Sequence, residues 1–218
     1  VNPNKTVIWG HSQGGQSSAF AAEIASEYAP ELPIQGAVVL APGLLPSLPL
    51  AVQGLLAGTQ PSGQTGFVME IAASWSRIYP DQMSPADILT PAGVAKLPVV
   101  DSVCGNQVFD AFQDGPMSTY VKDPVPAIFY TLATENTPGS KRIQMPIIMA
   151  QGMKDTTIIP QLTLAFDKQL CQMGNTVDFH IYPNDTHPGV VVASRDTVQS
   201  WIKDRFNGNP APTNCTNQ

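Results

Sequence analysis

Residues 6–15, TVIWGHSQGG, limit the folds open to this chain more than any other stretch. A short apolar run of strand type leads into the pentapeptide GHSQG, and small residues typical of a helix follow it. This order is the context in which a G-x-S-x-G pattern marks a sharp strand-to-helix turn with an exposed serine. We expect glycine at Gly10 and Gly14 because side chains there would collide with the flanking strand and helix. The alternative reading is a glycine-rich turn with an incidental serine.

Ser12, at the centre of the pentapeptide, is the candidate nucleophile. The turn would aim its hydroxyl away from the sheet. The backbone N–H of Gln13 would then lie at the positive end of the following helix, where it can bind a developing oxyanion. Because His11 lies within the turn and cannot easily turn back onto Ser12, we expect it to contact residues of the site without reacting itself.

The charge of the chain excludes two classes of partner. Charged residues make up 13% of the sequence, and 17 acidic against 11 basic residues give a net charge of −6. The sequence therefore predicts no binding to nucleic acid or to an anionic membrane surface. No apolar run approaches the ~18 residues of a transmembrane span, and residues 1–10 lack the charged start and apolar middle of a signal peptide.

The three cysteines, Cys104, Cys171 and Cys215, form no CxxC pair and no Cys/His cluster. This spacing argues against zinc or iron–sulfur ligation, so we expect no metal and no other cofactor. Low charge, 21 prolines and three N-x-S/T sequons favour a secreted protein in which a disulfide and glycans can form. The three sequons begin at Asn4, Asn184 and Asn214. Such tripeptides also occur by chance.

Further along the chain, apolar runs alternate with helical patterns. Residues 34–41, 146–152 and 177–182 are each of strand length. The first is a continuous apolar run, as expected of a parallel strand covered on both faces, and the second is another buried strand. With residues 6–9 they predict an α/β fold whose mostly parallel sheet has four recognisable strands.

Between residues 42 and 145 this alternation stops for roughly a hundred residues, where an α/β unit normally has one helix and two short loops. We therefore expect a core of residues 1–41 and 146–218 with residues 42–145 inserted as a mostly helical cap subdomain. No acidic or histidine constellation occurs in the insertion. Its leucine, phenylalanine and tryptophan content fits either acyl-chain binding or an ordinary helical core.

A serine hydroxyl needs a base to take its proton and a carboxylate to orient that base. Asp155 and His187 each follow a predicted strand, at the sheet edge where catalytic groups collect in open α/β sheets. The chain order Ser12, Asp155, His187 is the order of α/β-hydrolases. Position alone leaves Asp155 equally open to a role as a helix cap or turn residue.

Two other residues compete for these roles. His180 lies inside a predicted strand, which leaves His187 as the histidine of a post-strand loop. Asp185 precedes His187 by two residues and is the rival acid. A side chain so near in sequence can hardly reach the far side of the imidazole from Ser12, so we assign Asp185 a supporting position.

At this point the sequence resembles a known family, the secretory LIP-type lipases of the α/β-hydrolase fold, the group of Candida-type lipase A. The resemblance covers nearly all of the chain. The motifs that carry it are GHSQGG at 10–15, WSRIYP at 75–80, DILTPAG at 87–93, QGMKDTTIIP at 151–160, QLCQMG at 169–174 and YPNDTHPGVV at 182–191.

The resemblance implies a serine carboxylic-ester hydrolase that acts on acylglycerols and other esters without a metal or organic cofactor. Ser12 would attack the ester carbonyl and form an acyl-enzyme, and His187 would take and return the proton. Asp155 would stabilise the imidazolium, while the Gln13 N–H would bind the oxyanion. The insertion would correspond to the cap of the family.

By the same resemblance, Cys171 and Cys215 look like the C-terminal disulfide of the family. The chain departs from the family in one respect, because only nine residues precede Gly10. In the related fold, strands and the loop with the second oxyanion donor lie upstream of that turn. We therefore expect this chain to be part of a longer enzyme.

The strand at residues 6–9 would then have an unpaired edge that needs cover. An upstream segment of the same precursor, a second copy of the chain or residues 1–5 could supply it. Two alternatives to an active esterase stay open. One is a catalytically impaired fragment or assembly module of a larger lipase, and the other is a peptidase or thioesterase on the same fold.

Overall fold

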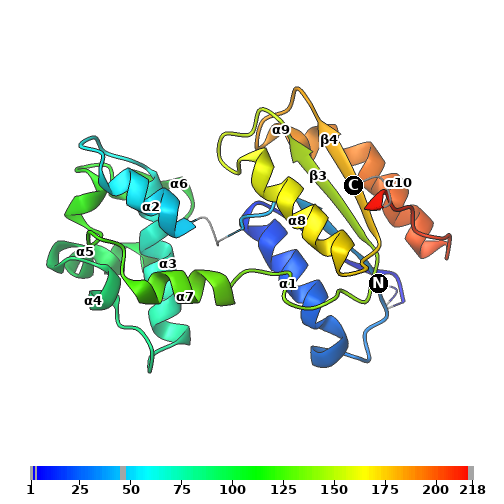
Figure 1. Ribbon diagram of the computed structural model, residues 1–218, viewed down its shortest axis with the longest axis horizontal. Coiled ribbons are helices and arrows are strands. Elements are labelled where there is room, and N and C mark those ends of the chain that lie inside the picture. Colours follow the sequence, from blue (N-terminus) through cyan, green and yellow to red (C-terminus); the bar gives the residue numbers. More distant parts are fainter. Residues whose placement is uncertain (1, 3, 45–47, 216–218) are drawn as a thin grey trace. The chain divides into compact units, whose positions relative to one another are not determined.

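The computed structural model describes residue 2, residues 4–44 and residues 48–215, and it divides the chain into two compact units (Figure 1). The sheet unit comprises Val1–Leu44 and Thr137–Gln218, and the helical unit comprises Leu45–Asn136. Residues 1 and 3, residues 45–47 of the expected insertion and Thr216 of the third sequon lie outside the described residues.

Within its described residues, the sheet unit holds four parallel strands in the order β1-β2-β3-β4, which confirms the predicted α/β sheet. The two central strands are almost completely buried, as their continuous apolar runs predict. The strands are β1 (Thr6–His11), β2 (Ile34–Leu40), β3 (Ile147–Gly152) and β4 (Val177–Tyr182).

Helices cover both faces of this sheet (Figure 1). Because side chains alternate along a strand, Val39 and Met149 pack towards one pair of helices while Val38 and Ile148 pack towards the other. The first pair is α1 (Gln13–Tyr28) and α8 (Pro160–Gln172), and the second is α9 (Gly189–Ala193) and α10 (Arg195–Phe206). The alanines of α1 let this helix lie close to the strands.

The helical unit has a hydrophobic core of its own, in which Trp75 packs on Phe129 with ring centroids 5.2 Å apart. Its elements are α2 (Leu48–Leu56), α3 (Gln64–Ile78), α4 (Pro85–Ile88), α5 (Pro91–Lys96), η2 (Leu97–Asp101), α6 (Asn106–Ala111), η3 (Met117–Thr119) and α7 (Ala127–Glu135). Across the described ranges of both units, no helix is long and apolar enough to cross a membrane.

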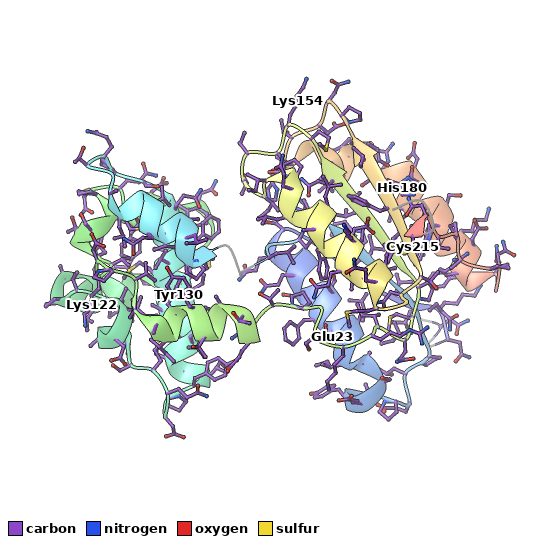
Figure 2. The ribbon with its side chains drawn as sticks, in the orientation of Figure 1. Glu23, Lys122, Tyr130, Lys154, His180 and Cys215 are labelled. Atoms are coloured by element: carbon purple, nitrogen blue, oxygen red, sulfur yellow. A yellow bond between two sulfur atoms is a disulfide. The ribbon has the colours of Figure 1, made fainter. Side chains whose placement is uncertain are left out.

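The C-terminal tail is attached to the sheet unit in two ways. A disulfide joins Cys171 on α8 to Cys215, which Figure 2 labels near the end of the chain. Asn214 pairs with the outer edge of β4: its backbone N–H donates to Val177 O at 3.0 Å, and its side-chain amide exchanges two hydrogen bonds with the Phe179 backbone. Cys104, in the helical unit, is a free and exposed thiol.

Candidate active site

The turn between β1 and α1 holds Ser12 in a backbone conformation that non-glycine residues rarely adopt. Its φ is 61° and its ψ is −123°. Two backbone hydrogen bonds stabilise the turn: Ser12 N–H donates to Leu40 O, and Gly43 N–H donates to Ser12 O, each at 3.0 Å. The chain after β2 therefore supports the strained serine.

The glycines of this turn differ from the expectation at one position. A Cβ on Gly10 would lie 1.8 Å from Gly14 O, so glycine is required there. A Cβ on Gly14 would meet no atom within 4 Å outside its own helix, and the expected collision at this residue was wrong. Helix α1 makes its close approach one residue later, where a Cβ on Gly15 would lie 2.7 Å from Leu40 O.

The structure brings Ser12, Asp155 and His187 together at the carboxyl ends of β1, β3 and β4. Ser12 Oγ lies 2.8 Å from His187 Nε2, and His187 Nδ1 lies 2.7 Å from Asp155 Oδ2. The Asp155 side chain is fully buried, whereas that of His187 is 15% exposed. Such an arrangement can move a proton from the hydroxyl to the imidazole and hold the imidazolium against a carboxylate.

Asp155 is held on its other side by the turn that follows it. Its Oδ1 accepts hydrogen bonds from the backbone N–H groups of Thr157 at 2.9 Å and Ile158 at 2.8 Å. Asp155 is thus both the turn residue of the alternative reading and the carboxylate that faces His187. These two bonds fix the plane of the carboxylate and leave Oδ2 directed at the imidazole.

His11 contacts His187 rather than Ser12. Its Nε2 lies 2.9 Å from His187 O, and the two imidazole rings are 4.5 Å apart between centroids. Burial, followed by the neighbouring His187, lowers the pKa of His11, although the bond to the His187 carbonyl opposes this shift. A neutral His11 can therefore donate to that carbonyl without placing a charge beside the triad.

Gln13 and Asp185, the two remaining site candidates, are neighbours of the triad residues in the chain. Gln13 is the first residue of α1, so its N–H has no acceptor within the helix and faces outward at the positive helix end. Asp185 O accepts a hydrogen bond from Lys154 N–H at 3.0 Å, which ties the loop before His187 to the turn before Asp155.

One buried residue at this site was missed by sequence reasoning. Gln151, the fifth of the six residues of β3, donates from Nε2 to Asp155 Oδ2 at 3.2 Å. The available signal was a carboxamide inside an otherwise apolar strand, IIMAQG. A buried amide of this kind needs hydrogen-bond partners, and at the carboxyl end of a strand those partners can belong to the site.

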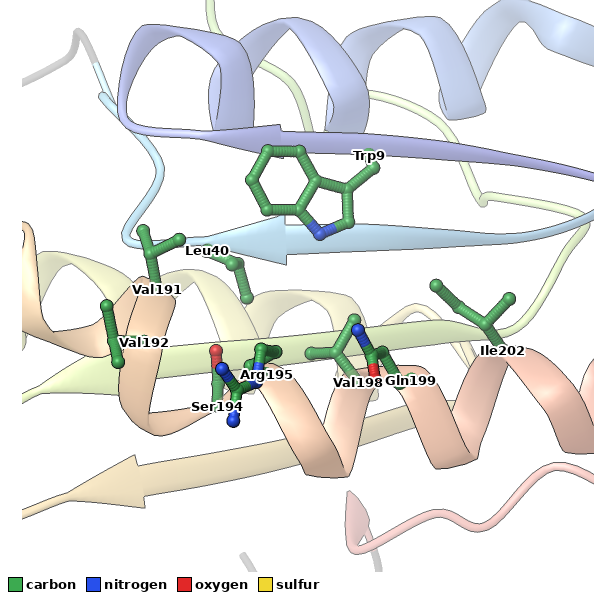
Figure 3. Close-up of a pocket in the computed structure, with 9 residues that line it drawn as sticks. All are labelled: Trp9, Leu40, Val191, Val192, Ser194, Arg195, Val198, Gln199 and Ile202. Atoms are coloured by element: carbon green, nitrogen blue, oxygen red, sulfur yellow. The ribbon is translucent and has the colours of Figure 1, made fainter.

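A hollow of about 330 Å³ lies elsewhere on the sheet unit, between β1 and the helices α9 and α10 (Figure 3). Its lining includes Trp9, Leu40, Val198 and Ile202, and none of Ser12, Asp155 and His187 contributes to it. Trp9 is 50% exposed. The hollow therefore belongs to the incompletely covered face of the edge strand β1, and not to the candidate active site.

Solved structures similar to this chain define its class. An X-ray structure of Candida antarctica lipase A superposes with a TM-score of 0.77 at 18% identity, over 96% of this chain and 50% of that protein. The rice cell wall degrading esterase LipA from Xanthomonas oryzae superposes with a TM-score of 0.62 at 15% identity, over 91% of this chain and 56% of that protein. The fold is therefore that of the α/β-hydrolases, as predicted.

Sequence comparison identifies the family within this class. A family model described as secretory lipase matches residues 1–214, so the chain belongs to the secretory lipases, and this prediction is confirmed. Lipase A of Arthroderma benhamiae is 26% identical over 99% of this chain and 46% of its own length. A secreted triacylglycerol lipase, LIP3, of Malassezia globosa is 24% identical over 99% of this chain and 49% of its own length.

A third relative differs in its description. It is a protein of Mycobacterium tuberculosis named probable inactive lipase MT1628, which is 28% identical over 93% of this chain and 46% of its own length. The chain thus spans about half the length of the curated relatives it matches.

Proposed function

We propose that this chain carries the catalytic machinery of a secreted carboxylic-ester hydrolase, a lipase or esterase. The observation that supports this most directly is the continuous hydrogen-bonded series from Ser12 Oγ through the His187 imidazole to Asp155 Oδ2, with distances of 2.8 and 2.7 Å. Membership of the secretory lipase family and the strained conformation of Ser12 point to the same chemistry.

In the proposed reaction, Ser12 Oγ attacks the ester carbonyl while its proton passes to His187 Nε2. The tetrahedral oxyanion accepts a hydrogen bond from Gln13 N–H at the start of α1. The proton on His187 then passes to the departing alkoxide, so that an alcohol leaves and an acyl-enzyme remains. Water then gives a proton to His187 and attacks the acyl-enzyme carbonyl. The bond to Ser12 Oγ breaks, the proton passes from His187 to Ser12 Oγ, and the acid leaves, which regenerates the serine and the neutral imidazole.

Asp155 does not exchange a proton in this scheme. Its buried carboxylate accepts the Nδ1–H of His187, which keeps Nε2 free to act as the base and stabilises the imidazolium after transfer. The substrates would be acylglycerols or simpler esters, and the apolar insertion at residues 42–145 would shape their site as a cap. No metal or organic cofactor is needed for any of these steps.

The second candidate is a catalytically impaired module of a larger lipase. It is favoured by the relative from Mycobacterium tuberculosis that is named probable inactive lipase. A fluorophosphonate probe distinguishes the two functions, because only a serine activated by its histidine reacts rapidly. An unreactive, folded chain would support the module.

The proposed function is tested by ester hydrolysis with purified protein, on a series of acyl chains from short to long. Ser12→Ala and His187→Ala should lower kcat by about 10⁶-fold, and Asp155→Ala by about 10⁴-fold, because the carboxylate orients the base and does not react. Ser17→Ala is the matched control: this serine is exposed on the same helix and should leave the rate unchanged. Wild-type turnover in folded Ser12→Ala protein would disprove the assignment.

We further propose that another strand pairs with the outer edge of β1. Parallel strands are normally buried on both faces, yet β1 lies at the edge of the described sheet and Trp9 is half exposed beside the hollow. An upstream strand of the same precursor is the first candidate, and a second copy of this chain is the other. Solution mass and hydrolysis rates of this chain and of an N-terminally extended one test this, since equal rates from a monomeric short chain would refute it.

A further inference from the structure

The side chain of Gln151 is completely buried at the carboxyl end of β3, and every polar atom of it has a partner. Its Nε2 donates to Gly152 O at 3.0 Å, to Ile158 O at 3.3 Å and to Asp155 Oδ2 at 3.2 Å. Its Oε1 accepts from Thr163 Oγ at 2.7 Å. Because two of the three groups around Nε2 are backbone carbonyls, which only accept, the NH₂ group must be on this side.

The amide shares one oxygen atom with the candidate base. Asp155 Oδ2 accepts both from Gln151 Nε2 and from His187 Nδ1, which is the shorter contact at 2.7 Å. Asp155 Oδ1 is already held by two backbone N–H groups. Gln151 therefore supplies a side-chain hydrogen bond to the carboxylate oxygen that faces the imidazole.

Thr163 links this arrangement to the helical layer. It lies on α8, is fully buried, and its hydroxyl donates to the oxygen of Gln151. The orientation of the amide, and through it that of the carboxylate, thus depends on a helix that packs against β3 and β4.

We propose that Gln151 is a positioning residue for the ester hydrolysis, which holds Asp155 Oδ2 in line with His187 while Thr163 fixes the Gln151 amide. Gln151 contacts no reacting atom and acts only through Asp155. The proposal rests on the proposed function, since the orientation of Asp155 matters for the rate only if His187 transfers a proton.

Loss of the Gln151 donor has a directional effect on this mechanism. The two backbone bonds keep Asp155 in place. Without the Gln151 donor, however, the negative charge on Oδ2 is less neutralised and attracts the imidazole proton of His187 more strongly. His187 must be neutral to accept the proton of Ser12. The rate should therefore fall to half of its plateau at a higher pH than in the wild type.

The shift is attributed to Asp155 because Gln151 bonds this carboxylate directly. In the described part of the chain, the titratable side chains that contact His187 are Asp155 and His11, whose ring centroid lies 4.5 Å from that of His187, and Ser12 lies at Nε2. Asp185 belongs to the loop that carries His187, and its backbone carbonyl is bonded to Lys154. None of these residues is altered in Gln151→Met, Thr163→Val or the control.

The experiment measures kcat and kcat/KM of ester hydrolysis against pH for Gln151→Met, Thr163→Val and a control. Gln151→Met should lower kcat by about 10- to 100-fold, the range typical of a misplaced catalytic group. It should also raise the acid midpoint of the profile by about 0.5 pH unit, because the lost bond acts on a charged group. Thr163→Val keeps the side-chain volume and should give a smaller shift in the same direction.

Asn175→Leu is the matched control. Asn175 is another buried carboxamide of the sheet unit, and it bonds Ile143 N–H and Leu170 O, each at 2.8 Å, without contacting the triad. This variant should lose stability and leave the acid midpoint unchanged. A midpoint shift in Asn175→Leu equal to that in Gln151→Met would overturn the proposal, because the effect would then be structural.

An unmoved or lowered midpoint in folded Gln151→Met protein would also overturn it. If Gln151→Met does not fold, Thr163→Val decides the question by the same criterion. Ser12→Ala in the same assay separates this inference from the proposed function: an inactive Ser12→Ala with an unshifted Gln151→Met refutes the inference alone. A fully active Ser12→Ala refutes the esterase mechanism itself.

Discussion

Glu23 offers the sharpest test of what holds the sheet unit together. It lies on α1 and is 3% exposed, and Figure 2 shows it labelled on this helix. Its carboxylate binds the segment that returns from the helical unit: Oε2 accepts from Gly139 N–H at 2.5 Å, and Oε1 accepts from Lys141 N–H at 2.9 Å and from the Ser140 hydroxyl. One buried side chain thus fastens three consecutive residues to the sheet unit.

Glu23→Gln keeps the size of the side chain but replaces an acceptor oxygen by an NH₂ group. In either orientation that group meets a backbone N–H, of Gly139 or of Lys141, and two donors cannot bond each other. An unpaired buried donor costs about 1–3 kcal/mol, and the remaining bonds lose the strength that a charged acceptor gives them. We therefore expect Glu23→Gln to lower the free energy of unfolding of the sheet unit by about 2–4 kcal/mol.

The matched control is Glu27→Gln, one turn further along α1. Glu27 pairs with the Lys141 side chain at 2.8 Å, but its own side chain is 66% exposed. Exposed ion pairs contribute little to stability, so we expect no measurable change. The two variants remove charge from the same helix and differ mainly in burial.

Urea unfolding followed by tryptophan fluorescence measures both variants. Trp75 belongs to the helical unit, so a Trp75→Phe background leaves Trp9 and Trp201, which both report on the sheet unit. Hydrogen exchange at the Gly139 and Lys141 amides provides a local measure. Equal losses of stability in Glu23→Gln and Glu27→Gln, or no loss in either, would refute the reasoning.

Two further predictions concern the turn at Ser12. Gly15→Ala should strongly destabilise the protein or abolish activity because the added Cβ would lie 2.7 Å from Leu40 O, whereas Gly14→Ala should be tolerated. Thermal unfolding and hydrolysis rates test both variants, and a Gly14→Ala protein more impaired than Gly15→Ala would contradict the geometry. The pKa of His11 is lowered on folding by burial and by His187, so the unfolded chain binds this proton more readily. The free energy of unfolding of the wild-type protein should therefore fall as the pH drops below about 6.5, and that of His11→Gln should fall less. Urea unfolding at several pH values measures this, and the same pH dependence in both proteins would contradict the prediction.

The sheet and its helices could be predicted from the sequence because their signals are local. Runs of mainly apolar residues at 34–40 and 147–152 are typical of parallel strands covered on both faces, and the structure buries both. The pentapeptide at residues 10–14 likewise requires a strained serine between a strand and a helix. The chain order of Ser12, Asp155 and His187 identifies these residues as candidates without any knowledge of the distances between them.

Helix length and faces in the insertion were less predictable. In the sequence, the spacing of Phe67, Ile71, Trp75 and Ile78 predicts one buried helix face. In the structure Ile78 is 66% exposed, and Val68 and Met69 are buried instead. The sequence pattern likewise predicts one helix over residues 84–95 and another over residues 99–112, but the structure breaks these stretches into shorter elements. Periodicity indicates that a helix exists, whereas the neighbours that pack on it decide which face is buried.

Only the tertiary structure decided which polar groups meet. The collision assigned to Gly14 occurs at Gly15, because the approach of α1 to Leu40 depends on how helix and strand pack. The hydrogen bonds from Thr163 through Gln151 to Asp155 join helix α8 to the carboxyl end of β3, and no spacing along the chain predicts them. Sequence patterns report burial and backbone preference, while hydrogen bonds between distant side chains depend on distances that only the folded chain sets.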